Sequence, residues 1–557
     1  MKNFIIALMC CLSATSVFGQ FQHSYGTEKN DIGESLDALY DSDARYIVAG
    51  RSDGLYFGGV DASLTKVQAS GAQVWSAVYG WDNTDLFNSV RRGAFLQDQV
   101  AYVAAGYTNS VGFGNADAWI LGANRNGAPS FSHLYGGKGT DIFHDIKNSY
   151  KKSLGQDGYV AVGQTNSYTN FFPGNSMYVV KTDVFGVLTR ATVIGGQGGQ
   201  TGYWIEQTKD GGYIIVGSSF NNQCHSGVFL KRHQDILVVR LREDLTMMWS
   251  FTYGYSGPAK PLSTRSIGRC VKEDAEGNFY ITGETNAFGL NNTYDAFLMI
   301  LDRFGSFRLM KTYGTECDNE FGKSLLLGKN NAGKEVVTVV GSNNPLSQPN
   351  YDALMFQTDR SLNLVWAKEY GRDSDDTGAE LTTYADKTYA FTGYTYSLGV
   401  GGPDIYLTET DLDGKSGTSC ERRVELKEIY HQPCQVRNVE QVFVDDWQRV
   451  QGPYERFLYA EDRCTTTLKA GEAEDDGTSK LFPNPTNDVL TLEVPKGYDA
   501  ASMKVIKLET GKEIMIDYES TDEDHVKLET TTLEKGVYIL EMTTEDGKVF
   551  RQRFIKE

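Results

Sequence analysis

The chain is short of positive charge. Its 557 residues include 53 Lys and Arg against 72 Asp and Glu, which gives a formal net charge of −19. A surface of this sign repels phosphate backbones, so we expect no nucleic-acid partner.

Long apolar runs are missing too. Beyond the N-terminal segment no stretch is long and apolar enough to cross a bilayer, so no membrane-spanning segment is predicted.

Signatures of catalysis are also missing. The sequence has no Gly-x-Ser-x-Gly and no His-Glu-x-x-His. Two Ser-x-x-Lys sequences begin at Ser63 and Ser149, but their companion motifs Ser-Asp-Asn and Lys-Thr-Gly are absent. Cys224, His225 and His233 lie close in sequence without the spacing of a familiar metal site. We therefore predict no catalytic residue, no metal site and no cofactor.

The N-terminus has the features of a signal peptide. Lys2 supplies a positive start, and Phe4–Leu12 form a short apolar run. Val17 and Gly19 are the small residues that a signal peptidase requires, which predicts residues 1–19 as the signal peptide and Gln20 as the first mature residue. A lipoprotein acylated at a cysteine of the apolar run is the alternative. Both readings predict an exported protein.

Six cysteines remain after that cleavage, and none of them forms a Cys-x-x-Cys motif, which argues against a zinc ribbon or a redox pair. An even number in an exported chain favours disulfides, although six cysteines allow 15 pairings. We expect at least one bridge among the last three, because they are close together in sequence. The six are Cys224, Cys270, Cys317, Cys420, Cys434 and Cys464.

The most informative feature present is a repeat. Seven copies of a pattern of about 57 residues follow one another from residue 21 to residue 418. Each copy has a corner that ends in glycine and reads Tyr-Gly in six of the seven copies, at Tyr25-Gly26, Tyr79-Gly80, Tyr135-Gly136, Ile194-Gly195, Tyr253-Gly254, Tyr313-Gly314 and Tyr370-Gly371. Each also has a strand-like run with a glycine, at Gly50, Gly106, Gly163, Gly217, Gly283, Gly341 and Gly393. A polar loop then leads to Asp61, Asp117, Asn175, Asp235, Asp295, Asp352 or Asp404.

A period of this size, built of short strands and turns, is typical of propeller blades. The clearest copy comprises Glu276–Asn286, Tyr294–Gly305 and Lys311–Gly314. These residues resemble the seven-bladed β-propeller repeat family that is common in exported bacterial proteins. We predict an all-β protein in which residues 20–418 form a seven-bladed β-propeller with four strands in each blade.

The two ends of the repeat region complement each other. Phe21–Gly26 matches the outermost strand of a repeat, as in Val74–Gly80, whereas the seventh repeat stops after Asp404–Gly414 and lacks that strand. An open ring would leave unpaired strand edges, which native sheets avoid. We therefore predict that the N-terminal strand completes the seventh blade.

The repeated Asp could hold a cation, but a structural role is the better interpretation. An Asp that opens a strand accepts hydrogen bonds from backbone N–H groups of the preceding loop, and a repeat copies that arrangement into every blade. Glu409-x-Asp411-x-Asp413 resembles the start of a calcium loop, but its twelfth position is Cys420 instead of a carboxylate. We interpret it as a hairpin turn.

The loops before the repeated Asp are the candidate binding face, because in a propeller they emerge on one side. Their Asn amides and aromatic rings suit sugars and protein surfaces alike, although turn chemistry alone also explains them. The predicted binding residues are Tyr56, Phe57, Asn109, Phe113, Tyr168, Phe171, Asn221, Asn286, Phe288, Asn343 and Tyr396.

The pattern changes after the repeats. Residues 419–470 contain three cysteines and are predicted to form a connector or small subdomain held by a disulfide. A Gly-, Glu- and Asp-rich linker follows at 471–480. Residues 481–557 show alternating strand-like runs, which predict a small Ig-like β-sandwich.

This last segment resembles the type A sorting domain of the type IX secretion system of Bacteroidetes. The resemblance rests on an opening Phe482-Pro483-Asn484-Pro485 and on Gly536-Val-Tyr538 near the end. It implies export to the cell surface or medium. It also implies three partners, namely the translocon, an outer-membrane shuttle protein and a sortase that removes the domain.

We expect a non-enzymatic, surface-attached or released protein whose propeller binds a glycan or a protein through its loop face. One alternative is a secreted carbohydrate-active hydrolase or lyase with acidic residues at the propeller channel. Another is a structural component of the secretion or gliding apparatus.

Overall fold

The structure is a computed structural model. It describes residues 20–41, 43–53, 59–93, 99–151, 155–168, 174–196, 198–220, 233–255, 264–288, 293–345, 350–399, 401–436, 440–443, 458–461, 481–482, 489–493, 498–507, 512–514, 518–520, 525–544 and 549–556. Strands and turns make up these ranges, and no helix that could cross a membrane is found within them. The predicted all-β class is confirmed. The predicted signal peptide, residues 1–19, lies outside the described residues.

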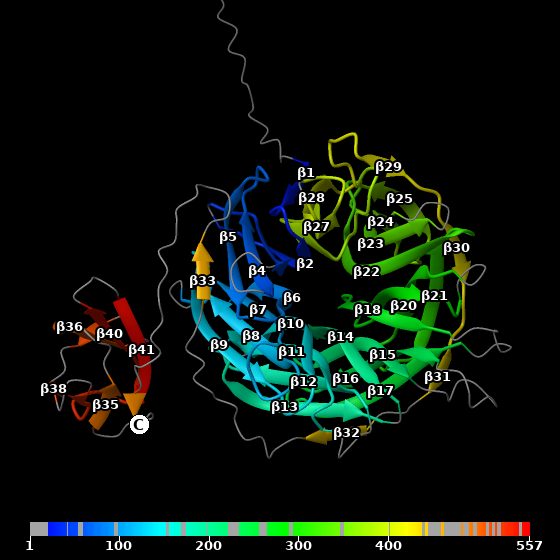
Figure 1. The fold of residues 1–557 in the computed structure, drawn as a ribbon. Helices are drawn as coiled ribbons and strands as arrows, with labels where there is room; N and C mark the ends of the chain where they lie inside the picture. Colours follow the sequence, from blue (N-terminus) through cyan, green and yellow to red (C-terminus); the bar gives the residue numbers. More distant parts are fainter. Residues whose placement is uncertain are drawn as a thin grey trace, which may run out of the picture. The chain divides into compact units, whose positions relative to one another are not determined.

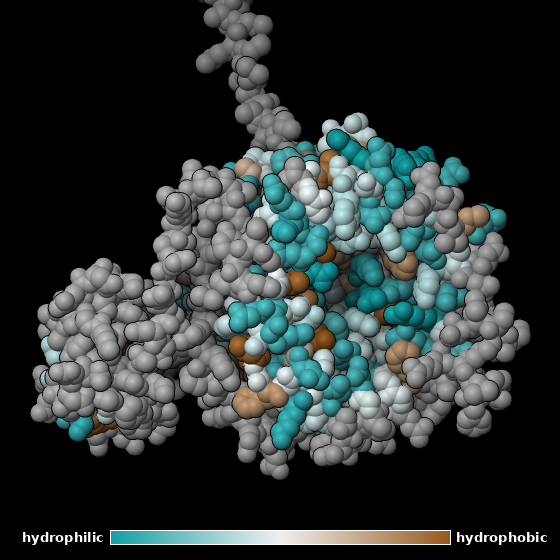
Figure 2. Space-filling view, viewed as in Figure 1, coloured by the Kyte–Doolittle hydropathy of each residue, from teal (hydrophilic) through white to brown (hydrophobic). Residues whose placement is uncertain are grey.

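Seven antiparallel sheets form a ring around a central hollow (Figures 1 and 2), which confirms the predicted seven-bladed propeller. In blades 1 to 6, four strands consecutive in sequence run from the centre to the rim. Innermost strand first, blade 1 holds β2 (Asp31–Ala38), β3 (Tyr46–Asp53), β4 (Val60–Val67) and β5 (Gln73–Gly80), and blade 2 holds β6 (Asp85–Arg92), β7 (Tyr102–Thr108), β8 (Asp117–Ala123) and β9 (Pro129–Tyr135). Blade 3 holds β10 (Asp141–Lys151), β11 (Gly155–Thr165), β12 (Ser176–Thr182) and β13 (Leu188–Gly195), and blade 4 holds β14 (Gln200–Gln207), β15 (Tyr213–Phe220), β16 (Gln234–Leu241) and β17 (Met247–Gly254). Blade 5 holds β18 (Ser266–Glu273), β19 (Phe279–Thr285), β20 (Asp295–Leu301) and β21 (Phe307–Gly314), and blade 6 holds β22 (Asp318–Lys329), β23 (Glu335–Pro345), β24 (Asp352–Asp359) and β25 (Leu364–Tyr370).

The seventh blade is closed by the N-terminus. It contains β26 (Glu380–Tyr384), β27 (Thr388–Thr395), β28 (Asp404–Asp411) and, as its outermost strand, β1 (Phe21–Tyr25). β1 pairs with β28 along its full length, with Phe21 opposite Glu409 and Tyr25 opposite Ile405. The two ends of the repeat region therefore share one sheet, as the phase of the repeats predicts.

The corner tyrosines explain why the repeat keeps its aromatic-glycine motif. Each ring is buried between two blades. Its hydroxyl donates a hydrogen bond to a backbone carbonyl in the tight turn of the next blade, which satisfies a polar group that would be costly to bury alone. The donor–acceptor pairs are Tyr25 and Gly71, Tyr79 and Gly127, Tyr135 and Gly186, Tyr253 and Gly305, Tyr313 and Leu362, and Tyr370 and Gly414.

Residues after the repeats surround the ring as a belt, which we define as β29–β33. These short strands are β29 (Glu421–Arg423), β30 (Lys427–Tyr430), β31 (Cys434–Val436), β32 (Glu440–Phe443) and β33 (Leu458–Glu461). They add a fifth, outermost strand to blades 6, 5, 4, 3 and 1 in that order (Figure 1). The described part of the connector is therefore not a subdomain with a core of its own. It covers the outer edges of five blades.

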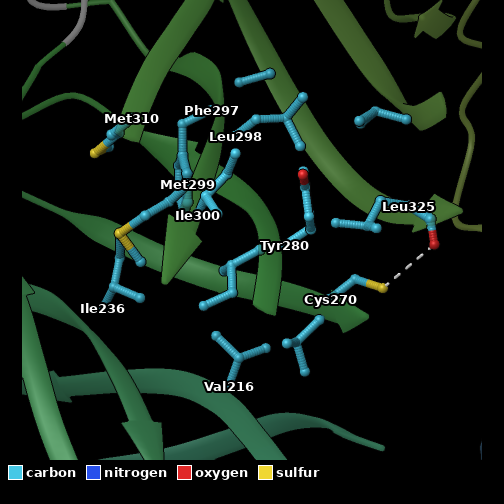
Figure 3. Packing of buried hydrophobic residues seen from close by; sticks show 14 of the residues in the cluster. Val216, Ile236, Cys270, Tyr280, Phe297, Leu298, Met299, Ile300, Met310 and Leu325 are labelled. Carbon is cyan, nitrogen blue, oxygen red and sulfur yellow. Dashed lines mark hydrogen bonds between the residues drawn. The ribbon is translucent and has the colours of Figure 1, made fainter. Parts of the chain in front are cut away.

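Three of the expected disulfide cysteines are free thiols in the structure. Cys270 lies in the hydrophobic core beside Val216 and Leu325 (Figure 3), and its Sγ is 3.8 Å from the Leu325 carbonyl oxygen. Cys317 is exposed, and Cys420 accepts a hydrogen bond from the side chain of Arg372. The prediction was wrong for these three because the fold places them at separate sites in the ring. Cys224, Cys464 and the side chain of Cys434 lie outside the described residues.

Residues 481–556 belong to a second compact unit. One sheet contains β34 (Leu481–Phe482), β35 (Val489–Glu493), β39 (His525–Glu529) and β38 (Tyr518–Ser520), and the other contains β37 (Lys512–Ile514), β36 (Tyr498–Lys507), β40 (Gly536–Thr544) and β41 (Val549–Lys556). Leu490 and Leu528 of the first sheet share a core with Val505 and Tyr538 of the second. The motif residue Tyr538 is thus a core residue, whereas Pro483, Asn484 and Pro485 lie outside the described residues.

Candidate functional site

The innermost strands of blades 1 to 6 share a β-bulge. At the same position in each, one residue has no partner on the second strand, and the pairing shifts by one residue. A bulge redirects a side chain, here toward the centre of the ring. The bulged residues are Glu34, Asn88, His144, Tyr203, Arg269 and Lys323. They all differ, although the repeats around them are closely similar.

The repeated glycine of the second strand is explained by this bulge. The bulge brings a carbonyl oxygen of the first strand so close that no Cβ would fit. A Cβ on Gly50 would lie 1.8 Å from the Ile32 oxygen, and one on Gly283 would lie 1.8 Å from the Ile267 oxygen. Gly106, Gly163, Gly217 and Gly341 meet the same obstacle at 1.7–1.9 Å. Gly393 of blade 7 instead meets the Thr377 oxygen, which precedes a first strand paired without a register shift. In blades 1 to 6 the repeated glycine therefore marks the bulge that presents the variable residues.

Five of the six bulged residues line a cavity of about 600 Å³ at one mouth of the central channel. Its walls come from the beginnings of the innermost strands and from the loops that precede the repeated Asp, and Figure 2 shows hydrophilic residues around the hollow. We call it the loop-side cavity. The sixth bulged residue, His144, packs its ring 5.0 Å from that of Tyr203. Burial, together with Arg269, lowers the pKa of His144 to about 4, so this imidazole is neutral at physiological pH.

One wall of the loop-side cavity is aromatic. The Tyr294 and Phe321 rings are 5.7 Å apart and stacked, and the Tyr351 ring lies 6.4 Å from Phe321. Tyr394 continues the lining in blade 7. All four rings are half-buried, so each keeps part of its surface open. We call these four residues the aromatic wall.

The backbone holds the aromatic wall in place. Tyr294 and Tyr351 each directly precede a repeated Asp, where the loop bonds to the next blade. The Tyr294 carbonyl accepts a hydrogen bond of 2.7 Å from the Glu320 N–H, and the Tyr351 carbonyl accepts one of 2.6 Å from the Asp376 N–H. The same position holds Val60, Ala116, Gly174, Gln234 and Pro403 in other blades. The aromatic residues are therefore additions to two blades, and the architecture does not require them.

Three cations lie beside this wall, together with the carboxylates of Glu284 and Glu34. Arg269 Nη2 lies 2.5 Å from Glu284 Oε1, and Lys323 Nζ lies 4.0 Å from Glu284 Oε2. Burial raises the pKa of Glu284, but Arg269 and Lys323 outweigh burial and hold it below its usual value. Arg265, at the exposed rim, acts on the same carboxylate. We call Arg265, Arg269 and Lys323 the cation group.

Two members of the cation group also rest on aromatic rings. The Arg269 guanidinium carbon is 4.4 Å from the centre of the Tyr203 ring, and Lys323 Nζ is 5.5 Å from that of Phe321. Such contacts fix long, flexible side chains in one orientation. The cavity therefore presents positive charge and ring faces in a preformed arrangement.

The floor of the loop-side cavity is a buried ionic layer. Arg91 Nη2 lies 2.6 Å from Glu380 Oε1 and 3.2 Å from Asp145 Oδ1. Lys147 Nζ lies 2.5 Å from Asp145 Oδ1 and 3.7 Å from the centre of the Trp204 ring. Beneath this layer a second cavity of about 410 Å³ opens at the other mouth, with Trp204 and Glu380 lining both cavities. We call it the opposite cavity.

Three of the four carboxylates that line the loop-side cavity are ion-paired, and the fourth is that of the bulged residue Glu34. Glu284 is held by the cation group, and Asp145 and Glu380 share Arg91. A glycosidase mechanism needs one carboxyl that gives up its proton and one that acts as base or nucleophile. Carboxylates bound by cations suit neither role without rearrangement. No group of three or more metal-ligating His, Cys, Asp or Glu side chains occurs among the described residues.

The predicted binding residues do not come together at one site in the structure. Phe113 and Tyr396 are exposed, by 55% and 52%. Asn286 uses its side-chain oxygen to accept a 2.6 Å hydrogen bond from the Arg265 N–H, which is turn chemistry. Asn109 is exposed and Tyr168 is half-buried. None of these described residues lines the loop-side cavity.

Two predicted contacts are wrong because the side chains are buried. Phe288 packs against the rings of Tyr255 and His431, and Asn343 belongs to β23 and donates a hydrogen bond to Glu369. The remaining predicted positions, Tyr56, Phe57, Phe171 and Asn221, lie outside the described residues.

Asp117, one of the repeated Asp residues, and Asp411 of the Glu409-x-Asp411-x-Asp413 motif have the structural role that the sequence predicts. Asp117 accepts hydrogen bonds of 3.0 and 3.1 Å from the N–H groups of Phe113 and Gly114, in the loop before it. Asp411 accepts two from the N–H groups of Asp413 and Lys415, which closes a hairpin turn.

Comparison with known proteins identifies the C-terminal segment. Residues 480–557 match the family described as secretion system C-terminal sorting domain. This segment is a secretion sorting domain. The match confirms the resemblance seen at Phe482 and Gly536, and it shows that the protein is a secreted cargo destined for the cell surface or the extracellular space. The sorting domain also implies interaction with the type IX secretion machinery.

The propeller has distant structural counterparts. Sqt1 from Chaetomium thermophilum shares 11% identity over 73% of this chain and 88% of its own, with a TM-score of 0.39. The α-L-arabinofuranosidase Arb93A from Fusarium graminearum, in complex with an iminosugar inhibitor, shares 8% identity over 71% of this chain and 98% of its own, with a TM-score of 0.38. A protein of unknown function from Dyadobacter fermentans shares 9% identity over 70% and 98%, with a TM-score of 0.36. These values support no conclusion about function, and a search of curated proteins finds no match.

Proposed function

We propose that this exported protein is a non-enzymatic glycan-binding propeller whose ligand occupies the loop-side cavity. The observation that carries the proposal is the aromatic wall of Tyr294, Phe321, Tyr351 and Tyr394 at the mouth of the channel. Aromatic faces suit the C–H faces of sugar rings, and the neighbouring polar side chains suit their hydroxyl groups. The cavity volume of about 600 Å³ lies within the range of small-ligand sites.

The shape of the site favours a glycan over a protein partner. A protein interface of standard size needs about 800 Å² on each side and is rather flat. Here the aromatic wall is recessed in the ring, where a sugar chain can enter. Three of the four carboxylates that line the cavity, Glu284, Asp145 and Glu380, are ion-paired, which supports binding without turnover. The hydrolase or lyase remains the alternative that the experiment must separate.

The experiment is a glycan array followed by calorimetry on the mature chain, residues 20–557. Phe321→Ala removes the central ring of the wall and is expected to weaken binding of the captured glycan about tenfold or more, which corresponds to about 1.4 kcal/mol. Phe304→Ala is the matched control, because that ring is 64% exposed and does not line the cavity. Equal affinities of the two variants would contradict the proposed site. Release of shortened glycan products would establish the enzyme instead.

For export, we propose that the sorting domain is read by the translocon and an outer-membrane shuttle protein and is then removed by a sortase. The domain forms a compact unit separate from the propeller and its belt. Its removal would therefore leave the loop-side cavity intact. Mass spectrometry of the secreted protein tests this. A chain ending near residue 480 is expected, whereas an intact C-terminus would favour a resident structural component of the secretion or gliding apparatus.

A further inference from the structure

We infer that the loop-side cavity selects an anionic sugar, one whose acidic substituent is held by the cation group while its ring lies on the aromatic wall. This inference rests on the proposed function and specifies the ligand class of that same site. It starts from a local imbalance of charge. Arg265, Arg269 and Lys323 lie around Glu284, and the charge of Glu34 also acts on Lys323, so three cations face two carboxylates.

The local excess of positive charge is opposite in sign to the net charge of the whole protein. The chain carries a net charge of −19, so a cluster of three cations at a cavity wall opposes the prevailing field. Glu284 lies closest to Arg269, at 2.5 Å, whereas Lys323 is 4.0 Å away from it. Arg265 has its side chain at the exposed rim of the cavity. An incoming anion would therefore meet Arg265 first and Lys323 deeper in the cavity.

The titration of Lys323 agrees with this picture. Burial lowers its pKa; Glu284 and Glu34 oppose that effect, and Arg269 and Arg265 add to it, so that the pKa stays below its usual value. The two carboxylates therefore do not fully compensate the lysine for burial and for the neighbouring cations. A bound carboxylate or sulfate would supply further negative charge without further desolvation of the lysine.

The rings beside the cations restrict the ligand to a sugar acid. Lys323 lies over Phe321, and Phe321 stacks with Tyr294, so an anion held by Lys323 is next to two ring faces. Arg269 is held in the same way over Tyr203 on the adjoining blade. Because these cations are already oriented, little side-chain entropy is lost when the ligand binds. A free phosphate or acetate could contact the cations but would leave the ring faces without a partner.

The test compares three matched polysaccharides on the mature chain by calorimetry: a polyuronate, the same polymer after reduction of its carboxyl groups, and a neutral polymer carrying sulfate esters. The polyuronate or the sulfated polymer is expected to bind at least tenfold more tightly than the reduced polymer, with an affinity that falls as salt rises. The two acidic arms show which acidic group is preferred. Equal or tighter binding of the reduced polymer would overturn this inference but leave the proposed function standing. Failure of every glycan to bind would overturn both.

Variants locate the contact. Arg265→Gln and Lys323→Met are each expected to weaken binding of the acidic polymer about tenfold and to reduce its salt dependence, and Lys323→Arg should retain most of the affinity. Lys209→Gln is the matched control, since Lys209 lines the opposite cavity. Thermal melting verifies folding, and Arg265 is exposed, so its loss does not disturb the core. If all four variants bind alike, the cation group does not hold the ligand.

Discussion

Arg91 and Glu380 meet across the centre of the ring, with 2.6 Å between Nη2 and Oε1, although they belong to blades 2 and 7 and are separated by blade 1. The same guanidinium reaches Asp145 of blade 3. One side chain thus links three blades at the floor of the loop-side cavity. Burial alone would lower the pKa of Arg91, but Glu380 and Asp145 raise it above its usual value.

Arg91→Met is therefore expected to destabilise the propeller by about 3–5 kcal/mol, because it leaves the buried Glu380 without its ion-pair partner and Asp145 with Lys147 alone. Chemical denaturation of the mature chain measures the loss. The control is Lys427→Met, which breaks an ion pair with Glu316 on the exposed surface and should change little. If both variants unfold at the same denaturant concentration, the central ion pair contributes no stability.

The repeated glycine gives a second prediction. Gly283→Ala places a Cβ 1.8 Å from the Ile267 carbonyl oxygen, and the bulge of β18 must shift to relieve the clash. We expect a loss of about 1–3 kcal/mol of unfolding free energy together with weaker glycan binding, since Arg269 is the bulged residue of that strand. Gly328→Ala is the control, because a Cβ there meets nothing within 4 Å. A stable Gly283→Ala variant with unchanged binding would refute the role given to this glycine.

The belt gives a third prediction. A chain ending at residue 418 lacks β29–β33 and exposes the outer edges of β5, β13, β17, β21 and β25. Exposed edges pair with other chains, so we expect a melting temperature several degrees lower and aggregation that increases with concentration. Light scattering and melting are compared with a chain ending at residue 470, which keeps the belt. Equal behaviour of the two chains would show that the belt is dispensable.

Glu320 gives a prediction about pH. Burial, and next the charge of Asp295, raise its pKa from 4.5 to about 9. Between these two values the folded chain keeps a proton that the unfolded chain releases, so this residue makes stability fall as the pH rises. Glu320→Gln removes that contribution. Its stability relative to the native protein should grow from pH 5 to pH 9, by up to about 1.4 kcal/mol per pH unit.

Denaturation at pH 5, 7 and 9 measures this effect. Glu276→Gln makes the same chemical change at an exposed position and serves as the control. Parallel pH profiles for the native protein and Glu320→Gln would contradict the raised pKa.

The fold could be predicted because its signals repeat. Seven corner motifs in phase give the number of blades, and the strand at Phe21–Tyr25 completes the count. The belt could not be predicted in this way. Its strands have three or four residues each, too few to show alternation, and they gain their structure from edges that the blades provide. The prediction of a disulfide was wrong at Cys270, Cys317 and Cys420 for a related reason: Cys270 is a core residue, and sequence spacing does not reveal burial.

The loop-side cavity could not be predicted from the repeat, because its lining residues are those that do not recur. Tyr294 and Tyr351 occupy a position that holds Val60 or Ala116 in other blades, and the bulged residues differ in all six strands. The residues of the proposed site are those that differ from one repeat to the next. The recurring glycine could have revealed them, since a strand glycine often marks a bulge or a close backbone approach.

A bulged residue has no partner across the strand pair, so exchanging it leaves the inter-strand hydrogen bonds untouched. Six such positions lie on the innermost strands, five of them in the lining of the loop-side cavity, and the glycines opposite them preserve the local geometry whatever side chain is installed. Natural drift, or a combinatorial library restricted to these six codons, can therefore retune specificity while the scaffold stays constant.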